Sequence, residues 1–397
     1  MHASAAQKDA NLTIDQQDEG LTVTWPDGSS RFFHYVWLRT CCFCTQCGST
    51  YTGTWTMQPS DVPLDIKPLQ VDNQDNENLV ITWPTDGHRS TYTFSWLLEN
   101  AYQKQDRIGR KHHPILWHSN ISTRPPSIDF GQAKNSAEGL LELLRQLRDY
   151  GFVVVRNGPK KTGGAEIVAN LIGELADAAY GKLFDLSPGK NQVTFGNTMN
   201  AVPPHTDEAY LYSPPGVNIL HCVRPVDEGG ESVLVDGFYL ANQMREHHPA
   251  EFETLTTHSY PFHRIVPDDG VYQRLRAKVI TLDDDGDVAG FRYHTRTLAP
   301  LDVVPEKVAR LHAATSKLSH LMLEPANQAC FKLDAGEAVL FDNHRVMHAR
   351  KAFNDPNRHL QICNISREAF HLKLRLTAYK TGHTAEADQI LSAGVSG

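Results

Sequence analysis

The chain has 397 residues and a mass of 44.4 kDa, with 40% hydrophobic and 21% charged residues. These values are typical of a globular protein with more than one domain. The 46 acidic against 38 basic side chains give a net charge of −8, which argues against nucleic acid or an anionic membrane surface as a partner. The sequence contains no run of about 18 apolar residues that would span a membrane. Its N-terminal segment lacks a signal or transit pattern, so we expect a cytoplasmic protein.

The first hundred residues contain a repeated pattern of short strands. Residues 21–38 and 79–97 each read as an alternating strand, a Trp-Pro and Asp/Gly turn, a second strand and a Trp-Leu end. A polar stretch that contains prolines follows. We therefore predict a small N-terminal β-domain over residues 1–112, a linker over 113–126 and a large domain over 127–397.

The large domain begins with a predicted amphipathic helix over residues 135–150, capped by Ser136, and a buried strand at 152–155. Further strands follow at long separations, and helical segments lie between them. Such a pattern favours a sandwich or barrel with helices on its outside over alternating β-α-β units. We expect a mainly β fold with flanking helices.

Four cysteines fall within seven positions after the first hairpin, and they include the spacing C-x-C-x₂-C. An odd total of seven cysteines without a secretory signal indicates metal binding rather than disulfides. A small β-domain with little core would gain folding free energy from a structural zinc ion. The candidate ligands are Cys42, Cys44 and Cys47, with His88 in the turn of the second hairpin. Cys41 is the alternative to Cys42, and we favour Cys42.

A second group of metal-ligating residues lies in the large domain. His205 and Asp207 form a His-x-Asp pair, and a later segment holds His344 and His348. Two imidazoles and one carboxylate bind ferrous iron and leave positions open for a chelating cosubstrate and dioxygen. We favour His348 over His344 because of its spacing to Arg358, ten residues further on.

Arg358 begins a predicted strand, and Ser232 follows a Gly-Gly turn. An arginine can grip a carboxylate with two hydrogen bonds, and a serine hydroxyl can add a third. Beside a ferrous ion, these residues describe a pocket for 2-oxoglutarate, which would chelate the metal through its oxo acid end.

Taken in order, these motifs resemble the γ-butyrobetaine hydroxylase family of Fe(II)- and 2-oxoglutarate-dependent dioxygenases, which includes trimethyllysine and 2-(trimethylamino)ethylphosphonate hydroxylases. The resemblance covers nearly the whole chain, through WLRTCCFCTQC, ITWPTDGH, PPHTDEAYLYSPPGVNILHC, GGESVLVDGF, FDNHRVMHAR and RHLQICNISRE. It implies a double-stranded β-helix (jelly-roll) catalytic domain, an N-terminal zinc domain and a homodimer. It also implies iron at His205, Asp207 and His348, zinc at Cys42, Cys44, Cys47 and His88, dioxygen as oxidant and ascorbate as reductant.

The resemblance also places the substrate. Family members hold a trimethylammonium group in an aromatic cage through cation–π contacts. Tyr180 and Phe184 fall at two cage positions, whereas Asn197 and Asn364 stand where tyrosines are expected. At the anion end, Tyr293 replaces the family's asparagine, and the residues close by include Arg292 and Arg296.

A more basic anion pocket would suit a phosphonate dianion. The favoured substrate is therefore 2-(trimethylamino)ethylphosphonate, hydroxylated next to phosphorus. γ-Butyrobetaine comes second and a trimethyllysine-type amino acid third. A zinc-ribbon binding module and a cupin-like hydrolase are the alternatives of other classes. Arg358 and the Gly-Gly-x-Ser segment argue against the hydrolase, which needs no dicarboxylate pocket.

Overall fold

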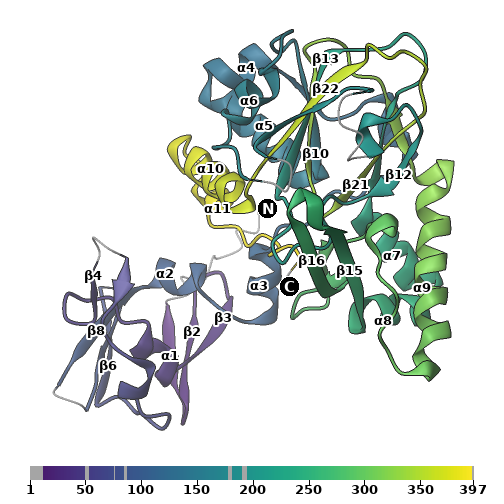
Figure 1. Cartoon of the computed structure of the whole chain (residues 1–397). Helices are drawn as coiled ribbons and strands as arrows, with labels where there is room; N and C mark the ends of the chain where they lie inside the picture. The colour runs from purple at the N-terminus through teal and green to yellow at the C-terminus, as the bar shows by residue number, and fades with distance from the viewer. Residues whose placement is uncertain are drawn as a thin grey trace, which may run out of the picture. The chain divides into compact units, whose positions relative to one another are not determined.

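The computed structural model describes residues 12–49, 53–75, 77–84, 87–177, 181–189 and 195–395. The chain divides into two compact units, Met1–Lys111 and His112–Gly397, which run from purple to blue and from blue to yellow in Figure 1. In the described part of the chain, no helix combines the length and apolar character that crossing a bilayer requires.

The first unit contains one arrangement twice: three antiparallel strands and a short helix. The first copy is β1 (Thr13–Gln16), β2 (Gly20–Thr24), β3 (Ser30–His34) and α1 (Tyr35–Thr40), and the second is β6 (Gln70–Gln74), β7 (Asn78–Thr82), β8 (Arg89–Thr93) and α2 (Phe94–Glu99). The predicted hairpin repeat is confirmed. The two Trp-Leu ends lie in the short helices α1 and α2.

Both copies contribute to a single apolar core, in which Phe33, Leu38 and Trp83 are fully buried. The other elements described in this unit are β4 (Gly48–Ser49), β5 (Thr54–Trp55), a 3₁₀ turn (Pro59–Asp61) and α3 (Lys104–Arg110). Because each three-stranded sheet is too small to bury its own apolar face, the two copies depend on each other and on any metal between them.

The second unit is built on two sheets that enclose a core. The larger has the order β11-β22-β13-β20-β10-β9 and the smaller β12-β21-β14-β19. Their bounds are β9 (Ser127–Asp129), β10 (Phe152–Arg156), β11 (Leu183–Leu186), β12 (Val202–His205), β13 (Val217–Arg224), β14 (Ser232–Asp236), β19 (Ala329–Phe331), β20 (Ala338–Asp342), β21 (Val346–Arg350) and β22 (His359–Ile365). Phe152 and Phe341 of the larger sheet pack with Leu234 and Val346 of the smaller one. The expected jelly-roll architecture is confirmed.

Helices cover the outer face of the larger sheet (Figure 1). They are α4 (Phe130–Asn135), α5 (Ala137–Tyr150), α6 (Gly164–Ala169), α10 (Arg367–Lys380) and α11 (Thr384–Ala387). In β10, Phe152 and Val154 face the space between the sheets, whereas Val153 and Val155 pack against the helices. Burial on both faces explains why this strand is apolar throughout. As predicted, Ser136 caps α5, because its Oγ accepts a hydrogen bond from the Gly139 N–H at 2.9 Å.

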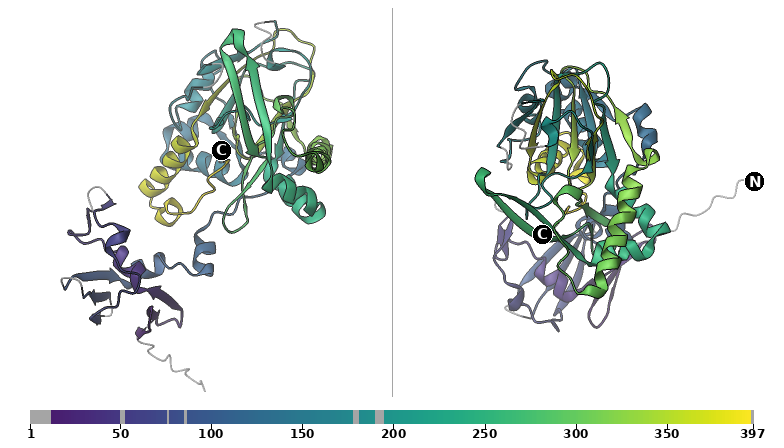
Figure 2. Two further views of the ribbon diagram at one scale, coloured as in Figure 1. Left: turned by 60° about the horizontal axis from the view of Figure 1, so that its bottom comes forward. Right: turned by 45° about the vertical axis from the view of Figure 1, so that its right-hand side comes forward.

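A third group of elements forms a separate apolar cluster beside the sheets. It contains α7 (Gly237–His247), α8 (Pro249–Thr257), β15 (Ser259–Val266), β16 (Val271–Lys278), β17 (Ile280–Leu282), β18 (Val288–Phe291) and α9 (Pro305–Leu323). β15 and β16 form a two-stranded sheet of their own, with one further bridge between Phe262 and Leu298, and Figure 2 shows this hairpin extending outward from the unit.

Residues 113–126, which we expected to form a linker, belong to the second unit. Trp117 is 3% exposed, and its backbone N–H donates to Asp236 Oδ2 at 3.2 Å. Arg345 Nη2 donates to the Ile115 carbonyl at 2.6 Å and to Asp236 Oδ2 at 2.8 Å. This buried ion pair holds the segment against the unit, so the polar composition of the segment reflects a packed irregular chain rather than a spacer.

We predict that Arg345→Met destabilises the protein by about 3–5 kcal/mol, because it leaves the fully buried Asp236 carboxylate without its cation. The measurement is the free energy of unfolding in urea. The control is Asp302→Asn, which removes an exposed ion pair with Arg276 and should cost less than about 1 kcal/mol. Equal effects of the two variants would contradict the prediction.

Candidate metal centres and active-site cavity

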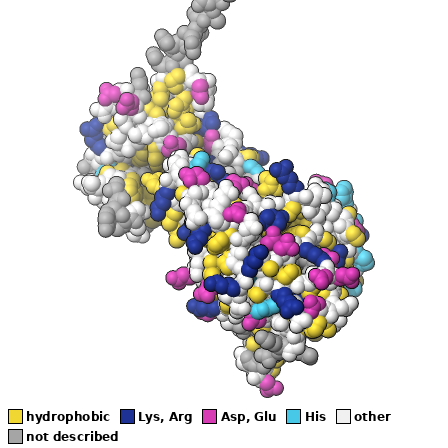
Figure 3. Space-filling view, turned by 90° about the horizontal axis from the view of Figure 1, so that it is seen from above, with side chains coloured by type: hydrophobic (Ala, Val, Ile, Leu, Met, Phe, Trp, Pro, Cys, Tyr) yellow, Lys and Arg dark blue, Asp and Glu magenta, His cyan; other side chains and the backbone are white. Residues whose placement is uncertain are grey.

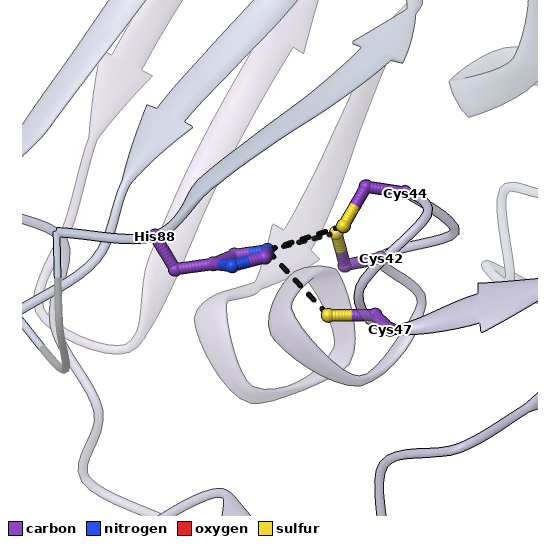
Figure 4. Close-up of side chains that lie close together, drawn as sticks. All are labelled: Cys42, Cys44, Cys47 and His88. Carbon is purple, nitrogen blue, oxygen red and sulfur yellow. Dashed lines mark hydrogen bonds between the residues drawn. The ribbon is translucent and has the colours of Figure 1, made fainter.

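Three thiols and one imidazole converge in the first unit. The Sγ atoms of Cys42, Cys44 and Cys47 lie 3.4, 3.7 and 3.5 Å from Nε2 of His88 (Figure 4). Tetrahedral zinc with Zn–S of about 2.3 Å and Zn–N of about 2.0 Å separates such atoms by about 3.5 Å. The four residues therefore fit a structural zinc ion, and Cys41 is not one of this group.

Local backbone structure explains this convergence. Cys42 follows α1 directly, and a tight turn brings Cys47 beside Cys44, since the Cys47 N–H donates to the Cys44 carbonyl at 3.0 Å. His88 stands before β8, and its carbonyl accepts from the Trp83 N–H at 2.8 Å. The ligands thus come from both copies of the repeat, and zinc would link the two copies.

The second cluster of metal-ligating residues lies on the smaller sheet of the second unit. His205 ends β12 and lies directly opposite His348 of β21 in their antiparallel pairing. Asp207 follows two residues later, with Oδ1 3.3 Å from His205 Nε2 and Oδ2 3.7 Å from His348 Nε2. One ligand atom from each residue lies within 4.8 Å of the other two. This donor set fits Fe(II) with open coordination positions.

Hydrogen bonds orient the cluster. His205 Nδ1 lies 2.9 Å from the Pro203 carbonyl, which fixes the proton on Nδ1 and leaves the Nε2 lone pair for a metal. The Asp207 N–H donates to Asn343 Oδ1 at 2.7 Å, and Asn218 Nδ2 donates to Asp207 Oδ2 at 2.7 Å. The carboxylate and its backbone are therefore both held in place.

The charges of the cluster are also suited to a cation. Burial acts to raise the pKa of Asp207, but His348 and His205 outweigh it and hold this pKa below its ordinary value. Burial lowers the pKa of His348 to about 4, and Asp207 only partly opposes this effect. Near neutral pH the site therefore holds a carboxylate and a neutral His348 imidazole, the forms that bind metal.

His344, the alternative to His348, does not belong to this cluster. It is 6% exposed, and its Nδ1 accepts a hydrogen bond from the Val395 N–H at 3.1 Å. Its Nε2 lies 3.4 Å from the Pro214 carbonyl. The side chain thus binds the C-terminal segment and the loop after Asp207.

A cavity of about 400 Å³ opens beside His205, Asp207 and His348. It lies between the two sheets and also reaches β15 and the segment after β18. The predicted residues that line it are Phe184, His205, Asp207, Ser232, Arg296, His348, Arg358 and Asn364.

Arg358 and Ser232 lie together in the wall of this cavity. Arg358 is 5% exposed, and its Nη2 donates to the Gly230 carbonyl at 3.1 Å. Its guanidinium stacks on the Phe353 ring at 4.9 Å, and Arg350 covers the same ring at 4.8 Å. Burial lowers the pKa of Arg358 to about 10, so the group remains a cation at neutral pH.

Three predicted substrate residues do not line the cavity. The Arg292 guanidinium donates to the carbonyls of Ala209 and Leu211 at 3.1 and 2.8 Å. The Tyr293 hydroxyl lies 2.9 Å from Ser319 Oγ within the apolar cluster of the third group. The Asn197 amide oxygen accepts from the Ser187 N–H at 3.3 Å. These side chains are occupied with internal contacts, and Tyr180 lies outside the described residues.

Sequence reasoning missed other residues that line the cavity, notably Asn218, Arg264 and Arg350. Arg350 donates to the carbonyls of Gly196, Thr198 and Asn200 at 2.6–2.8 Å and so fixes the chain beside the cavity. One signal was available: Asn218 is a polar residue inside the apolar run of β13. Arg264 on a hairpin strand carries no comparable signal.

Comparison with known proteins adds to this geometry. Residues 119–364 match the taurine catabolism dioxygenase TauD, TfdA family, and residues 12–98 match the γ-butyrobetaine hydroxylase-like N-terminal family. The chain is 33% identical to a γ-butyrobetaine dioxygenase of Pseudomonas sp. (strain AK-1), over 88% of this chain and 91% of that protein. The chain belongs to the γ-butyrobetaine hydroxylase family of dioxygenases.

Other members of the family are similar over comparable lengths. The mitochondrial trimethyllysine dioxygenase of Rattus norvegicus is 30% identical over 91% of this chain and 86% of that protein. Among solved structures, a taurine dioxygenase from Burkholderia xenovorans has a TM-score of 0.48 and 15% identity, over 64% of this chain and 89% of that one. As a dioxygenase of the γ-butyrobetaine hydroxylase family, the protein uses Fe(II), 2-oxoglutarate and dioxygen, and its Cys₃His cluster fits structural zinc.

We predict that Cys44→Ser releases the zinc and unfolds the first unit, because structural zinc contributes about 10–16 kcal/mol to small domains that depend on it. Zinc content by mass spectrometry and thermal unfolding by calorimetry measure the two effects. Cys41→Ser is the matched control, since Cys41 is outside the ligand group, and it should retain zinc. Zinc loss in the control alone would contradict the assignment.

Proposed function

We propose that the protein hydroxylates a C–H bond of a small trimethylammonium zwitterion, with 2-(trimethylamino)ethylphosphonate as the favoured substrate. The carbon next to phosphorus receives the hydroxyl group. The observation that carries the choice of substrate is the set of cationic side chains in the cavity, which exceeds what 2-oxoglutarate alone requires.

In this proposal His205, Asp207 and His348 hold Fe(II). Arg358 and Ser232 bind the far carboxylate of 2-oxoglutarate, and the buried guanidinium supports this role because it can form two charge-assisted hydrogen bonds. When bound, the iron and 2-oxoglutarate activate dioxygen, so that 2-oxoglutarate yields succinate and carbon dioxide and one oxygen atom enters the substrate. The protein's own task is to hold one C–H bond beside the metal and to restrict water.

The ammonium end of the substrate is assigned to the side of the cavity formed by β11 and β22. Phe184 and Asn364 line it there. A quaternary ammonium cannot donate hydrogen bonds, so it is held by the face of an aromatic ring and by amide oxygen dipoles. Tyr180, the other cage position that the family resemblance suggests, lies outside the described residues.

The anion end is assigned to another part of the cavity wall. Arg296 follows β18 and Arg264 projects from β15, and both line the cavity. Two guanidinium groups suit a tetrahedral dianion better than a single carboxylate. Arg296 thus keeps the role that the sequence suggested, and Arg264 takes the place that Arg292 cannot fill.

γ-Butyrobetaine is the second candidate, because a relative 33% identical to this chain bears the name γ-butyrobetaine dioxygenase. A trimethyllysine-type amino acid is the third, on the similarity to the rat enzyme. The match of residues 119–364 to a dioxygenase family sets aside a zinc-ribbon binding module. The homodimer, the cytoplasmic location and the need for ascorbate remain predictions.

The test is succinate formation by iron-reconstituted protein with 2-oxoglutarate and ascorbate, measured separately for each trimethylammonium compound. The phosphonate should stimulate succinate formation most, and Asp207→Ala should abolish stimulation because it removes a metal ligand. Preference for γ-butyrobetaine would overturn the phosphonate assignment. Turnover of 2-oxoglutarate without stimulation by any of the compounds would overturn the trimethylammonium cage.

A second prediction concerns the anion end. Arg296→Gln should raise KM for the phosphonate by about 10–100-fold, because it removes a charge-assisted contact of about 1.5–3 kcal/mol. The KM for γ-butyrobetaine should rise less. Arg276→Gln is the control, since Arg276 does not line the cavity. Equal increases for both substrates would contradict a dianion site at Arg296.

Figure 3 shows basic and acidic side chains interspersed over the face that it presents. The cationic groups of the proposal differ in arrangement from this outer surface, since Arg264, Arg296 and Arg358 all line one cavity.

A further inference from the structure

Asn218 is a polar residue in β13, a strand that is mostly apolar on both of its faces. It lies near the start of β13, between Val217 and Ile219, which pack against the outer helices. Its own side chain faces the cavity and is 1% exposed. Packing alone would favour an aliphatic residue here, because burying an amide costs free energy unless its hydrogen bonds are made.

The amide nitrogen of Asn218 contacts Asp207, one of the proposed metal ligands. Asn218 Nδ2 donates to Asp207 Oδ2 at 2.7 Å. This contact also fixes which end of the amide is which, because the amide oxygen could not approach a carboxylate oxygen so closely. Oδ1 of Asp207 is then the oxygen that faces His205 Nε2, at 3.3 Å.

Asn218 and Asn343 both hydrogen-bond to Asp207, but to different parts of it. Asn343 binds the backbone: its Oδ1 accepts from the Asp207 N–H at 2.7 Å, and its Nδ2 donates to the Asp207 carbonyl at 3.1 Å. Asn218 binds the side chain. Since the terminal torsion of an aspartate has a broad, two-fold profile, backbone contacts alone do not set the orientation of the carboxylate.

The amide oxygen of Asn218 indicates that the cavity binds a hydrogen-bond donor. Asn218 Oδ1 is buried and has no hydrogen-bond partner among the described protein atoms. An unpaired buried acceptor costs about 1–3 kcal/mol. A donor within the cavity, a water molecule or a hydroxyl group of the ligand, would satisfy it.

We propose that Asn218 is a positioning residue for the metal centre. It holds Asp207 Oδ2 so that Oδ1 remains directed at the metal position, and its own Oδ1 accepts a hydrogen bond from a donor bound in the cavity. The inference rests on the proposed metal site at His205, Asp207 and His348, but not on the identity of the substrate.

The test is the affinity of the iron-free, zinc-containing protein for Mn(II). Mn(II) prefers oxygen and nitrogen ligands and does not compete well for the thiolates of the zinc site. The electron paramagnetic resonance signal of free Mn(II) gives its dissociation constant, and the spectrum of the bound ion reports its coordination. Asn218→Leu replaces the amide with an apolar group of similar size, and it should weaken Mn(II) binding by about 10–100-fold.

Asn364→Leu is the matched control. Asn364 lies directly opposite Asn218 on β22 and lines the same cavity, but its side chain is not hydrogen-bonded to Asp207. The Mn(II) affinity of Asn364→Leu should stay within about twofold of the wild type. This result would show that losing any amide from the cavity does not by itself weaken metal binding. Thermal unfolding establishes that each variant is folded.

Asn218→Ala serves as a second variant, because it deletes the amide without adding apolar volume, and it should reproduce the loss. A folded Asn218 variant with unchanged Mn(II) affinity and an unchanged bound spectrum would overturn the inference. Wild-type protein that binds no Mn(II) would overturn the proposed metal site as well. If the wild-type protein binds Mn(II) normally but prefers a substrate other than the phosphonate, only the proposed substrate is overturned.

Discussion

The register between β12 and β21 is the constraint on which the active site depends. It places His205 opposite His348, although the two residues are far apart in the sequence. The next strand continues the alignment, because Ser232 of β14 lies opposite Arg350 of β21. A slip of one residue would turn every side chain of a strand to the other face. Such a slip of β12 against β21 would turn His205 away from His348 and break up the proposed metal site.

The two candidate metal centres differ in their number of ligands, and the difference matches the proposed roles. The cluster of the first unit offers four ligand atoms, the number that a closed structural zinc site uses. The cluster of the second unit offers three ligand atoms and adjoins the cavity. Four protein ligands suit a metal that stabilises a fold, whereas three leave coordination positions for reactants.

Much of this arrangement could be predicted from the sequence. The candidate metal ligands could be predicted because each motif is local. The motifs are a C-x-C-x₂-C loop, a His-x-Asp pair and His348 ten residues before Arg358. The strands could, because β10 and β22 have strong apolar patterns with clear ends. The packing of residues 113–126 could not be predicted. The ion pair of Asp236 and Arg345 that fixes this segment joins positions far apart in the chain.

The proposed anion end of the cavity was the least predictable part. β18 ends at Phe291, and beyond a strand end the alternation of side chains no longer tells which residue faces a cavity. There the Arg292 N–H donates to the Val279 carbonyl, and a 3₁₀ turn over Thr295–Thr297 carries Arg296 to the cavity instead. Arg264 arrives from a different element altogether, so no spacing in the sequence relates it to the other residues.

The hairpin of β15 and β16 has a consequence for how this enzyme can change over evolution. Its base is anchored, because Phe262 is buried and the Ala299 N–H donates to the Pro261 carbonyl. Its tip carries exposed residues such as Tyr272, and neither strand pairs with the sheets that hold the metal ligands. Insertions or substitutions in this ribbon can therefore change the cavity wall at Arg264 without altering the pairing of the strands that carry His205 and His348.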